Sequence, residues 1–125
     1  MKRLYDRQED FEAEITIFTE AEGGRKTPPL NGIRWDFVYE GDDVKDGMYM
    51  IWPEFIDSEG NAISKDVPLK GTYRARMYIL NRELAHSMHR DRIKPGTSFY
   101  SMEGPHKVAK GVVLKVTGLT QENGT

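Results

Sequence analysis

The chain has 125 residues and a formal net charge of −2, and its length fits one domain with a single hydrophobic core. With 38% apolar and 30% charged residues it has the composition of a soluble domain, and the absence of cysteine excludes disulfides, thiolate nucleophiles and cysteine-bound zinc. No apolar run approaches the roughly 18 residues of a membrane span, and residues 1–10 lack the apolar stretch of a signal peptide. We therefore expect a cytoplasmic domain without membrane contact.

Six segments predict β-strands, because their apolar or aromatic residues follow the pattern of a half-buried strand. In the first segment Phe11, Ala13 and Ile15 alternate with polar residues, and in the fourth Ala75 and Met77 alternate with arginines. The predicted strands cover residues 11–19, 34–39, 49–55, 71–80, 97–102 and 112–117.

The segments between these strands carry turn residues. Residues 22–29 contain two glycines and two prolines, which exclude both a helix and a central strand. Residues 81–92 are the one stretch that fits a helix, with Asn81 as N-cap and Glu83 in the first turn, and their polarity predicts one or two turns. Six strands with at most one short helix predict an all-β fold, either an antiparallel barrel or a sandwich.

Charge is distributed unevenly along the chain. Residues 1–69 hold 8 Lys and Arg against 16 Asp and Glu, a balance of −8, whereas residues 70–115 hold 10 against 3, a balance of +7. One interpretation is that the basic segment 70–115 binds an acidic partner. The other is that a compact barrel interleaves the two halves, so that their charges neutralise each other. We favour the second, because the domain as a whole lacks the positive charge that is typical of nucleic-acid binders.

The sequence contains no catalytic constellation. His86 and His89 lie three residues apart with Asp91 nearby, which permits a metal site, but the zincin spacing is absent and exposed polar histidines are the simpler interpretation. Residues 23–27, Gly-Gly-Arg-Lys-Thr, lack the spacing of a phosphate-binding loop, and no serine lies in a nucleophile motif. We therefore predict that the protein is not an enzyme and that it holds no metal, cofactor or nucleotide.

Three stretches near the start resemble one known family. Phe-Glu-Ala-Glu-Ile-Thr-Ile-Phe at 11–18, Glu-Gly-Gly-Arg-Lys-Thr-Pro at 22–28 and Gly-Ile-Arg-Trp-Asp-Phe at 32–37 follow one another in this order. They are similar to the opening of the third, C-terminal domain of elongation factor Tu.

The far end of the chain extends this resemblance. Lys-Pro-Gly at 94–96, Glu-Gly at 103–104 and Gly-Val-Val at 111–113 match the order of the same domain. The resemblance covers residues 11–118. Its most specific feature is the Glu-Gly-Gly-Arg-x-Thr-Pro loop followed at the right separation by Gly-Val-Val.

The resemblance implies a six-stranded antiparallel closed β-barrel of the elongation factor Tu third-domain type over residues 11–118. Residues 1–10 are then an N-terminal extension, and residues 119–125 are a flexible tail. The GTPase domain of that family has no counterpart in this sequence, so the resemblance implies no GTPase activity.

In elongation factor Tu the third domain also contacts the T-stem of aminoacyl-tRNA. The positions near the tRNA correspond here to Arg25, Lys26, Asp36, Lys45 and Glu103. Asp36 replaces an amide with an anion that phosphate repels, so Arg25, Lys26, Lys45 and Glu103 stay as the candidate binding residues. Arg25 has an equally good second interpretation, as a donor to carbonyl groups of its own turn.

Two hypotheses for function follow from the resemblance. The leading one is a non-enzymatic interaction module that binds a protein partner, either a component of the translation apparatus or a second copy of the chain. It expects an exposed aromatic patch that includes Trp35, Tyr39 or Tyr100. The alternative is RNA binding, with tRNA as the natural candidate, through the glycine loop (residues 22–28) and the basic segment 70–115.

Overall fold

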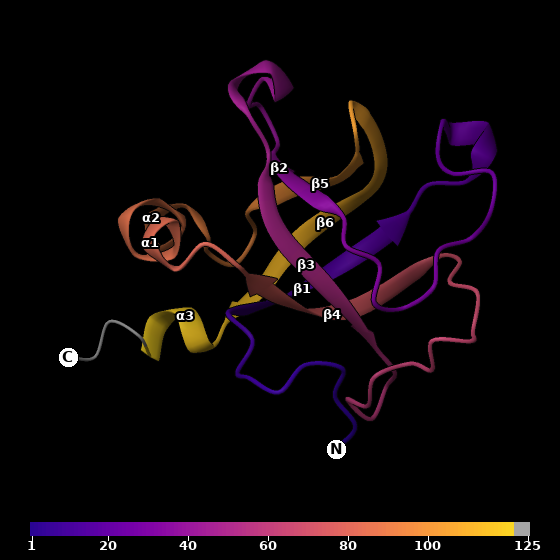
Figure 1. Cartoon of the computed structure of the whole chain (residues 1–125), viewed down its shortest axis with the longest axis horizontal. Helices are drawn as coiled ribbons and strands as arrows, with labels where there is room; N and C mark the ends of the chain where they lie inside the picture. Colours follow the sequence, from indigo (N-terminus) through magenta and orange to yellow (C-terminus); the bar gives the residue numbers. More distant parts are fainter. Residues whose placement is uncertain (122–125) are drawn as a thin grey trace.

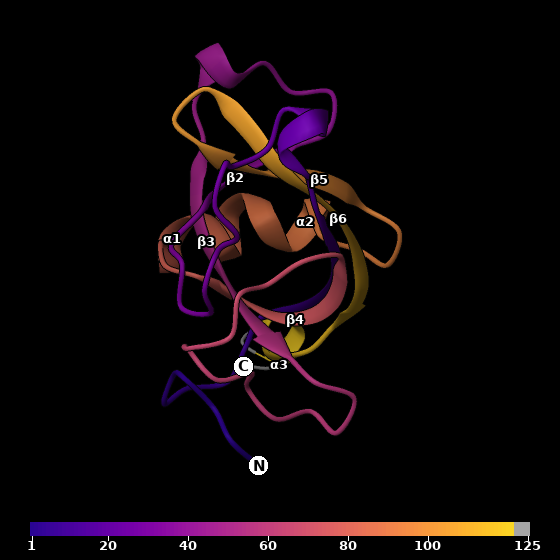
Figure 2. The ribbon, with the colours of Figure 1, turned by 90° about the vertical axis from the view of Figure 1, so that its right-hand side faces the viewer.

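Six antiparallel strands close into a β-barrel in the computed structural model, which describes residues 1–121 (Figure 1). A view from the side shows the strands wrapping around a common interior (Figure 2). The prediction of a six-stranded antiparallel closed barrel is confirmed. Going around the barrel, each strand pairs with the next and the last pairs with the first, in the order β1 (Phe11–Ile17), β4 (Thr72–Ile79), β3 (Tyr49–Ile56), β2 (Asp36–Tyr39), β5 (Ser98–Glu103) and β6 (His106–Val116).

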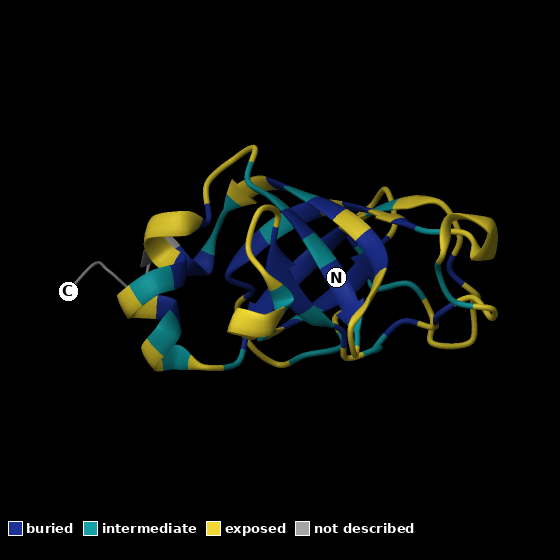
Figure 3. Ribbon diagram, turned by 90° about the horizontal axis from the view of Figure 1, so that it is seen from above, coloured by how far each residue is buried: buried dark blue, intermediate teal, exposed yellow. Residues whose placement is uncertain are grey.

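The core fills the interior of this barrel. The alternation in β1 turns Phe11, Ala13 and Ile15 inward, and all three are fully buried. The rings of Phe37 and Phe99 stack with centroids 4.5 Å apart, and the Phe11 ring meets each of them edge-on at 6.4 Å. Burial is accordingly concentrated in the barrel wall, whereas the connecting loops are exposed (Figure 3).

Strand β6 begins six residues before the predicted segment, at His106. Gly111 lies in it directly opposite Phe99 of β5. A Cβ atom at Gly111 would lie 2.1 Å from the Phe99 ring, so the ring occupies the space that a side chain would need. The glycine is therefore a packing requirement of the core.

We expect Gly111→Ala to lower the free energy of unfolding by about 2–3 kcal/mol, because an added methyl group overpacks the core. Thermal and denaturant unfolding followed by circular dichroism measures this loss. In a Phe99→Leu background the same alanine should cost much less, since the ring that it strikes is gone. An equal cost in both backgrounds would contradict the assignment to Phe99.

Residues 1–10, expected as an N-terminal extension, pack against the barrel. Glu9 and Asp10 are buried. The Asp10 carboxylate accepts hydrogen bonds from the Ile79 backbone N–H at 2.7 Å and from Arg82 at 2.9 and 3.1 Å, and it also accepts one from Arg7. The last residues of the segment therefore continue the folded domain.

A buried ion pair lies on the outer face of β3 and β4, beneath this N-terminal segment. The Arg76 guanidinium donates to Glu54 at 2.6 Å and to the Lys2 carbonyl at 3.0 Å. Glu54 also accepts from the Tyr78 hydroxyl at 2.7 Å and from the Leu4 backbone N–H. Burial alone would raise the pKa of Glu54, but these hydrogen bonds outweigh it and hold the pKa below its usual value.

The helical stretch is longer than one or two turns, so the predicted number of turns was wrong. It has 11 residues and contains a widened π-helical turn. The Asn81 side chain accepts from the Leu84 N–H as the expected N-cap, and Ala85 and His89 face the core four residues apart. The stretch is built from α1 (Arg82–Leu84), η3 (Ala85–His89) and α2 (Arg90–Arg92).

A short helix, α3 (Gly118–Gln121), follows β6 where a flexible tail was expected from residue 119. Leu119 is buried, and its backbone N–H donates to the Asp10 carbonyl at 3.1 Å. The rest of the expected tail, 122–125, lies outside the described residues. Within residues 1–121 no helix has the length and apolarity needed to cross a bilayer.

Candidate binding groove

The glycine loop that follows β1 is built by local hydrogen bonds. Thr19 and Glu22 form a reciprocal capping box around the 3-10 turn η1 (Glu20–Glu22). Hydrogen bonds from Thr19, foremost from its backbone N–H, hold the pKa of the Glu22 carboxyl below its usual value. Gly23 then ends the turn in the left-handed conformation, with φ of 92°, which a side chain would strain.

Gly24 is required for a different reason. A Cβ atom there would lie 2.3 Å from the carbonyl oxygen of Phe18, so the loop can fold back onto the end of β1 only without a side chain. The Gly24 N–H donates to the Thr19 carbonyl at 2.8 Å and fixes this close approach. Both glycines are therefore needed for the conformation of the loop, which leads directly into Arg25.

The glycine loop and residues 69–71 enclose a groove of about 280 Å³ at one end of the barrel. Leu69 and Ile17 are buried beneath it, and Phe18 is half-buried at its side. The Leu69 backbone N–H donates to the Pro29 carbonyl at 2.9 Å, which ties the two walls together. The groove is lined by Ile17, Phe18, Thr19, Glu20, Arg25, Lys26, Thr27, Pro28, Pro29, Leu69, Lys70 and Gly71.

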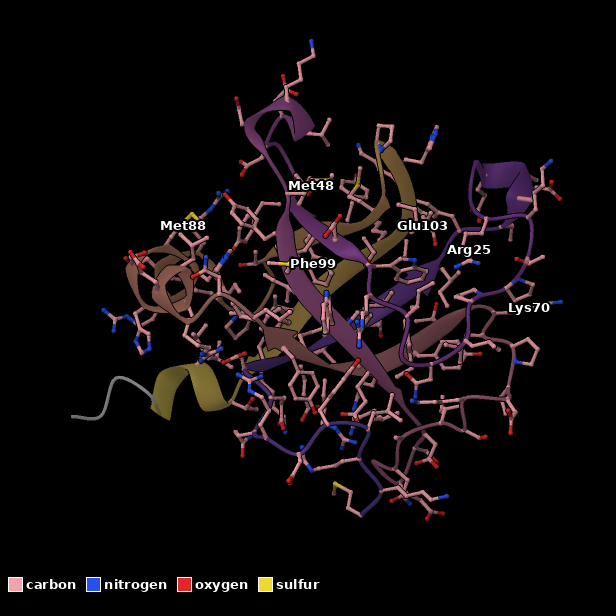
Figure 4. The ribbon with its side chains drawn as sticks, viewed as in Figure 1. Arg25, Met48, Lys70, Met88, Phe99 and Glu103 are labelled. Atoms are coloured by element: carbon pink, nitrogen blue, oxygen red, sulfur yellow. The ribbon has the colours of Figure 1, made fainter. Side chains whose placement is uncertain are left out.

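Two of the predicted binding residues, Arg25 and Glu103, contact each other. The Arg25 guanidinium donates to a Glu103 carboxylate oxygen at 2.9 Å, and the same oxygen accepts from the Trp35 indole N–H at 2.7 Å. This pair links the glycine loop to the end of β5, as Figure 4 shows with Arg25 beside Glu103. Arg25 thus binds a carboxylate rather than the carbonyl groups of its own turn.

The other two predicted residues lie in different places. Lys26 is exposed and lines the groove beside Arg25. Lys45 lies in the turn η2 (Val44–Asp46), which projects from the top of the barrel in Figure 1, well apart from the glycine loop. Lys70, which the sequence analysis counted only as part of the basic segment 70–115, lines the groove from the side of residues 69–71; Figure 4 labels it near the glycine loop.

The aromatic patch expected from Trp35, Tyr39 or Tyr100 is not exposed in the described part of the chain, and this expectation was wrong. Trp35 and Tyr39 are buried, with 1% and 2% of their surface exposed, because they point into the barrel with Phe37. Tyr100 faces outward but is half-buried, and the Lys107 ammonium lies 4.1 Å from its ring centroid.

The two neighbouring histidines lie in different environments. His86 is exposed as expected, but His89 is buried, which corrects the expectation of two exposed histidines. The His89 ring nitrogen Nδ1 lies 2.7 Å from the Tyr39 hydroxyl and is engaged there. Among residues 1–121 no three His, Asp or Glu side chains gather as metal ligands would.

The two oppositely charged halves of the chain are interleaved in the barrel, as the second interpretation of the charge asymmetry predicts. Acidic residues of the first half pair with cations of the segment 70–115. The pairs are Arg76 with Glu54, Arg92 with Asp42, Arg82 with Asp10, and both Arg74 and Lys115 with Glu12. Much of the positive charge of that segment is therefore neutralised within the domain.

No model of a known protein family matches the chain. The class to which the protein belongs is therefore defined by its fold, a closed six-stranded antiparallel β-barrel. The barrel carries at one end a groove with an apolar floor and a cationic rim.

Proposed function

We propose that the protein is a non-catalytic interaction module that binds a protein partner in the groove. The observation that carries this proposal is the combination of a buried apolar floor, including Leu69, with the exposed cations Lys26 and Lys70 at the rim. A concave surface of this kind offers burial for an apolar side chain and directed charge around it. The proposal includes no GTP hydrolysis and no other catalytic step.

The resemblance of residues 11–118 to the third domain of elongation factor Tu supports this function and suggests the partner. In that factor the domain works by contacting other macromolecules rather than by catalysis. A component of the translation apparatus is accordingly the first candidate, and a second copy of the chain is the next. The resemblance stays part of the proposal, together with the partner that it suggests.

RNA binding is the alternative, and three features make it the weaker one. Five cations of the segment 70–115 already pair with carboxylates, so they are less available to phosphate. In addition, Glu103 holds Arg25 of the glycine loop. An apolar floor is also better suited to a protein side chain than to a phosphate backbone.

The test is capture of partners from a lysate of the source cell, with and without ribonuclease. We expect a protein that the wild type retains after ribonuclease and that the double variant Lys26→Glu, Lys70→Glu loses. The variant Lys2→Glu, Lys94→Glu is the matched control, because it makes the same charge change at exposed positions outside the groove. Binding that ribonuclease abolishes, or that both variants retain equally, would contradict the proposal.

A further inference from the structure

We infer, on the basis of the proposed function, that the groove binds a short acidic segment of protein chain through an aliphatic side chain flanked by carboxylates. The volume of about 280 Å³ lies at the lower end of ligand pockets, which suits one or two side chains better than a large cofactor. The floor is mostly aliphatic, with Ile17 and Leu69 buried beneath it. An aliphatic side chain is the group that such a floor stabilises most.

The charges at the rim determine what surrounds that side chain. Three lining residues are cations, Arg25, Lys26 and Lys70, and one, Glu20, is an anion. Within the described residues the Lys26 and Lys70 ammonium groups make no ion pair, whereas Arg25 is held by Glu103. The rim therefore complements carboxylates on both sides of an apolar anchor.

The apolar surface continues beyond the groove. A second hollow, of about 530 Å³, lies next to it and shares Arg25, Thr27 and Pro28 with its lining. Leu30, which lines the second hollow, is 46% exposed. Exposed aliphatic groups beside a concave surface are typical of interaction sites. The ligand is accordingly an extended segment that can place a second aliphatic side chain on Leu30.

The wall between the two hollows also restricts how a segment is held. Pro28 and Pro29 have no backbone N–H, and the Pro29 carbonyl already accepts from Leu69. This wall therefore cannot pair with an added β-strand, and recognition depends on side chains and charge. Binding should consequently weaken steeply as the salt concentration rises.

Arg25 supplies a means to test the charge argument directly. A ligand carboxylate would compete with Glu103 for the Arg25 guanidinium, which Glu103 holds at 2.9 Å. Glu103→Gln removes the competing charge and keeps an oxygen that accepts from Trp35. We expect this variant to bind acidic segments about two- to threefold more tightly, whereas a purely structural role of Glu103 would give no gain.

The experiment is a titration of the full chain with three pools of blocked hexapeptides, followed by amide NMR shifts. Each peptide has two central aliphatic residues, flanked by Asp and Glu in one pool, by Asn and Gln in the second and by Lys and Arg in the third. We expect the acidic pool alone to shift the amides of Ile17, Lys26 and Lys70. In a Trp52→Phe background, Trp35 fluorescence reports the same binding, since its indole N–H contacts Glu103.

Lys26→Ala with Lys70→Ala should weaken binding of the acidic pool by about tenfold, and the control Lys2→Ala with Lys94→Ala by less than about twofold. Equal binding of the amide pool, or no binding of any pool, would overturn the inference. Either result leaves the proposed function standing if the capture experiment still yields a protein that depends on Lys26 and Lys70. Failure of that capture, by contrast, would overturn the proposed function itself.

Discussion

Replacing Glu54 by alanine is expected to lower the free energy of unfolding by about 3–5 kcal/mol. The change leaves the Arg76 guanidinium, only 3% exposed, without its counter-charge in the barrel wall. The Tyr78 hydroxyl and the Leu4 backbone N–H lose their acceptor as well. Urea unfolding at neutral pH, followed by circular dichroism, measures the loss.

The matched control for this prediction is Glu59→Ala. It removes the same charge from an exposed turn only five residues further along the chain, and we expect a change within about 0.5 kcal/mol. Glu54→Ala should also release the N-terminal segment, because Lys2 and Leu4 bind the same network. Faster tryptic cleavage after Arg3 or Arg7 in the folded protein would report that release. Equal stability of the two variants would contradict the predicted loss, and unchanged cleavage would show that the buried pair does not hold the segment.

The strands could be predicted because their signal is local. In β1 the alternation of Phe11, Ala13 and Ile15 with polar residues is visible in seven residues of sequence. The start of β6 was missed because its inward-facing positions break the pattern: Val108 and Ala109 are adjacent, and Gly111 has no side chain. The space at Gly111 is filled by Phe99 from another strand, which sequence periodicity cannot show.

The length of the helical stretch was underestimated for a related reason. Its core-facing positions are Ala85 and His89, four residues apart on one face. A histidine counts as polar in a hydrophobic pattern, so the face has only one recognisably apolar member. The burial of His89 follows from its contact with Tyr39, which comes from a distant part of the chain.

The candidate groove was predicted in part. The glycine loop is a local motif, and its glycines, Arg25 and Lys26 were found from sequence. Lys70 was counted in the basic segment 70–115 but was not placed at the loop, because residues 69–71 come to the loop only in the fold, where Leu69 bonds to Pro29 and Ile17 bonds to Gly71 across a long separation in sequence. The sequence did contain a signal that Trp35 is buried, since it lies two residues before Phe37 and therefore points to the same, inward face of the strand.

Lowering the pH from 6.5 to 4 is expected to destabilise the fold by about 3 kcal/mol through His89 alone. Burial, reinforced by the nearby Arg92 guanidinium and only partly opposed by Asp10, lowers the pKa of His89 from 6.5 to about 4. The Tyr39 hydroxyl lies 2.7 Å from the ring, and the edge-on Tyr49 ring has its centroid 4.7 Å away. His89 is itself only 1% exposed, so the neutral imidazole is shielded from solvent.

The direction of the effect follows from proton binding. Between pH 6.5 and pH 4 the unfolded chain protonates this histidine and the folded chain does not, so acid favours unfolding. The stability that neutral His89 contributes is fully present above pH 6.5 and is lost as the pH falls through this window. Buried Glu54 has a lowered pKa and adds its own loss only at lower pH, below about 4.5. The range from pH 6.5 to 5 therefore isolates His89.

Denaturant unfolding at a series of pH values separates this histidine from the others. His89→Gln keeps an acceptor for the Tyr39 hydroxyl but cannot titrate, so its stability should change little between pH 6.5 and 5, while the wild type loses about 2 kcal/mol. His106→Gln, at an exposed position of β6, should keep the wild-type slope. A flat wild-type profile, or an unchanged slope in His89→Gln, would mean that the folded protein accommodates a charged His89. In that case the contact with Tyr39 would have to open without loss of the barrel.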